Sequence, residues 1–116
     1  MTEKSKINSG TNLQKAFFKF DCTVQDGKIR LALKQTNINT PYYYEAFFTL
    51  EELCQKNPAF QSCKTLEEVQ KHLLFLFQKD PTSLKSLEDD KKIEINFVIY
   101  LFCIEENVNF ILDRKQ

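Results

Sequence analysis

Four cysteines and one histidine are the residues of this chain that could bind a metal ion or act as nucleophiles. The cysteines are Cys22, Cys54, Cys63 and Cys103, and His72 lies nine positions after Cys63. Common zinc sites use closely spaced cysteine pairs, and the sequence has no such pair. We therefore expect no metal site and no cofactor, and thiols that pack as small apolar groups in a reducing, cytoplasmic compartment.

Pairs of adjacent carboxylates could supply a general acid and a general base. They are Glu51-Glu52, Glu67-Glu68, Asp89-Asp90 and Glu105-Glu106. The first two pairs belong to Thr-Leu-Glu-Glu motifs beginning at Thr49 and Thr65, which are typical of helix N-termini, where the Thr and the second Glu cap each other's amides. The last two pairs lie in expected turns. Because no pair is expected to face another across an apolar cleft, the sequence predicts no catalytic residues and no enzyme.

The aromatic run Tyr42-Tyr43-Tyr44 could stack nucleic-acid bases if it lies on an exposed strand. Such a surface needs basic residues between the aromatic ones, and residues 36–49 contain no Lys or Arg. The whole chain has 16 basic and 16 acidic residues. Zero net charge does not favour phosphate binding, but it makes self-association easier. A single-stranded nucleic-acid-binding module is therefore kept only as the alternative function.

Strand periodicity predicts a domain of the α+β class. Apolar residues alternate from Ala16 to Val24 and again from Ile29 to Leu33, and the Asp26-Gly27 pair between them is a strong hairpin signal. Further strands are expected at 42–48, 84–87, 93–104 and 108–112, with turns at 88–92 and 105–107. The expected order is β-β-β-α-α-(β)-β-β, an antiparallel sheet or sandwich with a helical hairpin between two strand groups.

Two helices are expected in the middle of the chain. The first runs from Leu50 to Lys56 and ends before Asn57-Pro58, because a residue before proline disfavours helical torsions. The second runs from Leu66 to Lys79, after a short loop over 60–64. Its apolar residues recur at the spacing of one buried helix face: Leu66, Val69, Leu73, Leu76 and Phe77. Polar residues 1–14 are expected to form a flexible N-terminal tail, so that residues 15–116 make a single domain.

Several apolar residues lie on strand faces that are otherwise polar. The candidate interface consists of Tyr43, Phe47, Val98, Tyr100 and Phe102. If the helical hairpin packs across this side of the sheet, it buries them. If it does not, they form an aromatic patch for a protein partner or a second copy of the chain. No apolar stretch reaches membrane-spanning length, so we expect no membrane partner.

A resemblance to a known kind of module covers roughly residues 42–115. It is carried by the segments YYYEAFFTLEEL, NPAF, TLEEVQKHLLFLF, KIEINFVIYLF and VNFILDRK, which look like a strand and helix-pair module of unicellular-eukaryote proteins. The element order is also similar to the head domains of coiled-coil scaffold proteins in the superfamily of the DNA-ligase partner and the centriolar cartwheel. That likeness implies an assembly role. We therefore expect a non-catalytic protein–protein interaction, scaffold or adaptor domain.

Overall fold

The structure is a computed structural model that describes residues 11–39, 42–79, 82–101 and 103–115. In this part of the chain, seven strands form one antiparallel sheet in the order β1-β5-β6-β7-β4-β3-β2. The strands are β1 (Thr11–Leu13), β2 (Phe18–Gln25), β3 (Lys28–Gln35), β4 (Tyr43–Phe48), β5 (Ser83–Leu87), β6 (Lys92–Leu101) and β7 (Ile104–Lys115). The helices are η1 (Lys15–Phe17), α2 (Leu50–Lys56), η2 (Pro58–Ser62) and α3 (Leu66–Phe77), of which η1 and η2 are 3-10 helices.

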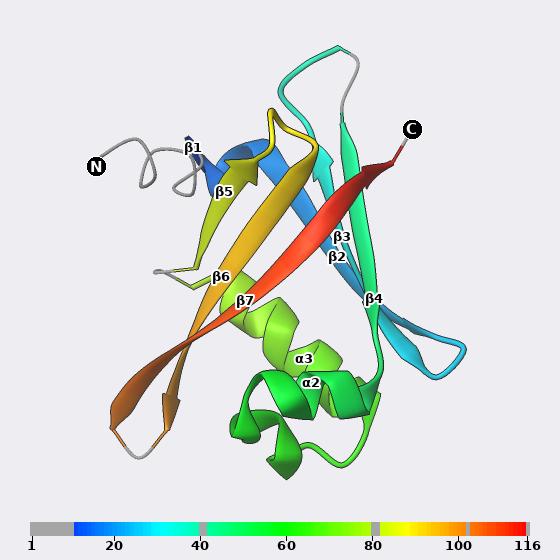
Figure 1. Cartoon of the computed structure of the whole chain (residues 1–116), viewed down its shortest axis with the longest axis vertical. Helices are drawn as coiled ribbons and strands as arrows, with labels where there is room; N and C mark the ends of the chain where they lie inside the picture. Colours follow the sequence, from blue (N-terminus) through cyan, green and yellow to red (C-terminus); the bar gives the residue numbers. More distant parts are fainter. Residues whose placement is uncertain (1–10, 40–41, 80–81, 102, 116) are drawn as a thin grey trace.

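The α+β class and the antiparallel sheet are confirmed, but the sheet is single and curled, and no sandwich is formed by the described residues. In Figure 1, β2, β3 and β4 splay away from β5, β6 and β7 at one end of the molecule, and α2 and α3 lie in this opening. The splay follows the register, because β4 pairs with β7 only from Tyr43–Lys115 to Glu45–Asp113. The far end of the β6–β7 hairpin extends away from β2–β4.

The Asp26-Gly27 hairpin is confirmed. β2 and β3 pair from Phe18–Gln35 to Gln25–Lys28, which leaves a two-residue turn. Asp26 and Gly27 have φ of 52° and 74°, and a two-residue turn of this kind requires positive φ at both positions. Asp tolerates this region and Gly does so without a steric cost, so the sequence determines the turn.

The helix boundaries were predicted closely. α2 spans Leu50–Lys56, with the reciprocal bonds of a capping box between Thr49 and Glu52. α3 begins at Leu66 as expected and ends at Phe77, two residues earlier than predicted. The loop expected over 60–64 is mostly replaced by η2, which starts at Pro58. Neither helix is long and apolar enough to cross a membrane, and this holds for the described residues generally.

Two sequence-based boundaries were wrong. The strand expected to end at Ile104 ends at Leu101, and the chain reverses before Ile104, with Cys103 at a φ of 65°. Residues 105–107, expected as a turn, lie inside β7, where Glu105 and Asn107 are exposed and Glu106 is half-buried, so a strand accommodates these three consecutive polar residues. In addition, Thr11–Leu13, within the segment expected as a tail, form β1 against β5. Residues 1–10 of that segment lie outside the described residues.

The core lies between the inner face of the curled sheet and the two α-helices. It joins residues of both helices to inward residues of the strands, and its fully buried members include Leu53, Val69, Leu73, Phe97 and Phe110. The helices thus cover one face of the sheet. Of the two alternatives for the apolar residues of the second face, burial by the helices does not hold for Phe47 and Tyr100, whose side chains are 43% and 65% exposed.

Candidate functional site

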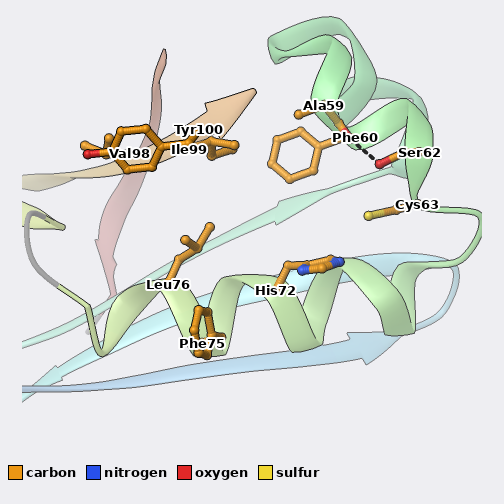
Figure 2. Close-up of a pocket in the computed structure, with 10 residues that line it drawn as sticks. All are labelled: Ala59, Phe60, Ser62, Cys63, His72, Phe75, Leu76, Val98, Ile99 and Tyr100. Carbon is orange, nitrogen blue, oxygen red and sulfur yellow. Dashed lines mark hydrogen bonds between the residues drawn. The ribbon is translucent and has the colours of Figure 1, made fainter. Parts of the chain in front are cut away.

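An apolar pocket of about 340 Å³ lies between α3, η2 and the end of β6. Figure 2 shows α3 on one side of it, with His72, Phe75 and Leu76, and the β6 residues on another. The lining residues are Ala59, Phe60, Ser62, Cys63, His72, Phe75, Leu76, Val98, Ile99 and Tyr100. We call this feature, with the strand edge beside it, the α3–β6 groove.

Two exposed aromatic side chains flank the α3–β6 groove. Phe75 of α3 is 58% exposed and Tyr100 of β6 is 65% exposed, so each presents a large apolar surface to solvent. Val98, one strand period before Tyr100, is buried. Phe75 is exposed because it lies off the buried α3 face of Val69, Leu73 and Phe77.

The groove lies next to an unpaired stretch of strand. β5 pairs with β6 only from Leu87–Lys92 to Ser83–Asn96. By contrast, β7 pairs with β6 along the entire length of β6, as far as the Leu101–Ile104 pair. In the described chain, residues 97–101 of β6 therefore have a neighbouring strand on one side only. An edge of this kind can pair with another chain.

The groove contains Cys63 and His72, the pair that could have acted as a nucleophile and base. The pKa of the Cys63 thiol is raised, first by burial and then by the negative charge of Glu68. A raised pKa disfavours the thiolate, which is the nucleophilic form. None of the ten lining residues is acidic, and the described residues hold no group of three potential metal ligands. The chemistry of the groove is that of apolar contact.

The structure divides the four described residues of the predicted interface between two surfaces. Val98 and Tyr100 line the α3–β6 groove. Tyr43 and Phe47 lie on the outer face of β4, where Tyr43 is half-buried beneath Arg30, whose guanidinium carbon lies 5.5 Å from the ring centroid. Phe102 lies outside the described residues. The prediction therefore combined two different surfaces.

More basic residues surround the tyrosine run in the folded chain than lie near it in the sequence. Tyr43 stands between Lys34 of β3 and Lys115 of β7, and Lys34 in turn is paired with Lys19 of β2. The lysines beside Tyr43 therefore come from neighbouring strands. The sequence of residues 36–49 alone could not show them.

The tyrosine rings themselves are largely engaged. Tyr44 is buried, and its hydroxyl donates a hydrogen bond to the carbonyl oxygen of Asp90. Arg114 covers the ring of Tyr42, with its guanidinium carbon 4.4 Å from the centroid. Base stacking needs free aromatic faces, and these contacts leave few of them.

Sequence reasoning missed Phe75, Leu76 and Phe60 as members of the site. One signal was available for Phe75, because Leu73-Leu74-Phe75-Leu76-Phe77 contains more apolar residues than a single buried helix face requires. The extra residues Leu74 and Phe75 are both exposed. No local signal indicates that η2 and β6 meet α3, since this depends on the tertiary fold.

A scan against protein-family models, a search of curated proteins and a search of solved structures each found no match for this chain.

Proposed function

We propose that this chain is a non-catalytic protein–protein interaction domain of the scaffold or adaptor type, and that its contact surface is the α3–β6 groove. The observation that carries the proposal is the pairing of Phe75 and Tyr100, two exposed aromatic residues, on either side of an apolar pocket. Aromatic residues are enriched in interface cores because they bury a large area at a small cost in conformational entropy.

The surroundings of the groove also favour a protein partner. A small polar substrate needs several convergent polar groups to orient it. The groove offers few, and the hydroxyl of Ser62 is already bonded to the carbonyl oxygen of Ala59 at 2.8 Å. A protein segment can instead use the unpaired main chain of β6 together with the apolar pocket. An interaction role thus accounts for both features of the groove.

The experiment that tests this proposal introduces charge at the rim of the groove. Phe75→Glu and Tyr100→Glu are compared with Phe47→Glu, a matched control that adds the same charge to an exposed aromatic position on β4. The tagged chain is cross-linked in cells, and its bound proteins are quantified by mass spectrometry. Each groove variant should bind the partner at least about tenfold more weakly, as expected for the loss of a central aromatic contact. The control should bind like the wild type.

Folding is measured for every variant by circular dichroism and thermal unfolding. If Phe75→Glu and Tyr100→Glu fold normally and keep every partner that Phe47→Glu keeps, the groove is not the contact surface. If only Phe47→Glu loses the partner, the surface lies on the outer face of β4.

A second candidate function is single-stranded nucleic-acid binding at the tyrosine run. The specific observation in its favour is the row Lys19, Lys34, Tyr43 and Lys115, in register across β2, β3, β4 and β7. The next row along these strands contains Asp21, Glu45 and Asp113, so the positive charge is confined to a narrow band. The coverage of Tyr42 and the burial of Tyr44 also leave too little aromatic surface, and protein binding remains the leading proposal.

A further inference from the structure

We infer that the occupant of the α3–β6 groove is a second copy of this chain, which adds its own β6 to the open edge of the first β6. The two sheets would then join into one continuous sheet about a two-fold axis. This inference rests on the proposed function, because it names the partner of the same groove. It is carried by the direction of the β6 main chain, by the self-complementary pairing that this direction allows, and by the protection of the other edges.

The direction of the β6 main chain is fixed by one hydrogen bond. The N–H of Arg114 donates to the carbonyl oxygen of Lys91 at 2.9 Å, so Lys91 directs its carbonyl toward β7. Directions alternate along a strand. In β6, therefore, Ile99 and Leu101 direct their main-chain groups toward β7, while Val98 and Tyr100 direct theirs to the open side. Each of the latter two offers one donor and one acceptor to an added strand.

These four groups are self-complementary. If two β6 strands pair antiparallel about a two-fold axis at Ile99, Val98 of each copy stands opposite Tyr100 of the other. Each such pair exchanges two hydrogen bonds, so all four groups of both copies are satisfied. The pairing also sets a β-branched side chain against an aromatic one, which is a favourable cross-strand contact. Ile99 of each copy would lie on the side of the sheet where the groove of the other copy opens.

The other accessible edges of the sheet carry features that discourage pairing. β1 has only three residues. On β2, the carbonyl oxygen of Cys22 is already bonded to the Gln70 side chain at 2.7 Å, and Lys19 and Asp21 carry charges. On β7, the carbonyl oxygen of Asn109 accepts a bond from Lys56 at 2.9 Å. Short length and charged residues are the usual protection of natural edges.

The β6 edge lacks this protection. Its residues Phe97-Val98-Ile99-Tyr100-Leu101 include no charge and no proline. The chain also has no net charge, so two copies approach without long-range repulsion. An apolar, uncharged edge beside an apolar pocket fits an identical strand better than it fits a charged segment of another protein.

The first test removes a donor from the open edge without disturbing the β6–β7 ladder. Tyr100→Pro deletes an N–H that points away from β7, whereas Tyr100→Thr keeps the N–H and serves as the matched control. Molar mass is measured by light scattering over a concentration series of the full chain. The wild type should approach the mass of a dimer. Tyr100→Pro should raise the dissociation constant at least about tenfold above that of Tyr100→Thr.

The second test reads the register directly and does not depend on the proline variant folding. In a Cys103→Ser background, Ile99→Cys places two thiols at the proposed two-fold axis. The Cα atoms of a non-hydrogen-bonded pair there are about 4.5 Å apart, which suits a disulfide. Under mild oxidation this variant should form a covalent dimer. Phe47→Cys in the same background should not.

Three results would overturn the inference: a wild type that stays monomeric throughout the series, a dimer that Tyr100→Pro leaves intact, or equal cross-linking of Ile99→Cys and Phe47→Cys. The proposed function fails separately, when the charge variants of Phe75 and Tyr100 keep all heterologous partners and all self-association. If the chain is monomeric and its groove variants no longer bind a different protein, only the second-copy inference is wrong and the proposed function stands.

Discussion

The hydroxyl of Tyr44 donates a 2.8 Å hydrogen bond to the main-chain carbonyl oxygen of Asp90, 46 residues further along the chain. This bond connects β4 to the turn between β5 and β6. That turn is unusual, because Glu88, Asp89 and Asp90 all have positive φ, between 51° and 67°. Positive φ costs free energy at residues other than glycine, so it persists only where the surrounding contacts hold the backbone in place. The Tyr44 bond therefore helps to place β6, and with it the groove.

We predict that Tyr44→Phe lowers the free energy of unfolding by about 1–3 kcal/mol, because it leaves the Asp90 carbonyl oxygen without this partner in a partly buried site. Urea unfolding at neutral pH measures the change. Tyr42→Phe is the matched control, since the Tyr42 ring lies at the surface, and it should change the stability by less than about 0.5 kcal/mol. Equal effects of the two substitutions would contradict this role for Tyr44.

A second prediction concerns the stability at alkaline pH. Burial raises the pKa of the Cys22 thiol from about 9 to about 12, with a smaller effect of Asp21. The folded chain therefore keeps this proton when the unfolded chain has lost it. The free energy of unfolding should fall as the pH rises from about 9 toward 12, by up to about 1.4 kcal/mol for each pH unit. Well below pH 9 the thiol is protonated in both the folded and the unfolded chain, and it contributes no pH dependence there.

Chemical denaturation at several pH values checks this prediction against Cys22→Ala, which lacks the thiol. The variant should be less stable at neutral pH because of the cavity, but its stability should fall less steeply above pH 9. A remaining slope is expected, since burial also raises the pKa of Tyr44, an effect of the same sign. Identical slopes for the wild type and the variant would refute the role of Cys22.

A third prediction separates the two candidate functions. With mixed single-stranded oligonucleotides at low salt, the wild type should show no binding that weakens steeply as salt is added, because the lysine row is narrow and most tyrosine faces are covered. Fluorescence anisotropy measures this. The contradicting result is salt-dependent binding that is abolished by Lys34→Glu and unchanged by Phe75→Glu. That result would assign the function to the tyrosine run.

The parts of the fold that could be predicted from the sequence are those with local causes. Asp26-Gly27 has the backbone freedom that its turn requires, and Thr49 with Glu52 closes the start of α2. The reversal before Ile104 has no such signal, since Cys103 adopts positive φ without being Gly, Asn or Asp. Polar residues 105–107 resemble a turn in composition alone.

The candidate site was predicted only in part, for a physical reason. Tyr100 stood out because it is apolar on an otherwise polar strand face. Phe75 and Phe60 belong to elements far from β6 in sequence, and only the curled sheet brings all three elements around one pocket. The lysines beside Tyr43 were missed for the same reason, because cross-strand neighbours are determined by register and not by nearness in sequence.

The most direct test of pairing between two copies at β6 is the amide hydrogen exchange rate of the β6 residues, measured by NMR at low and at high protein concentration. At low concentration the N–H groups of Val98 and Tyr100 should exchange quickly and that of Ile99 slowly, because only the last is bonded to β7. At high concentration Val98 and Tyr100 should become protected while Ile99 changes little. If the Val98 and Tyr100 amides exchange at the same fast rate at every concentration, the β6 edge is not where this chain meets its own copy.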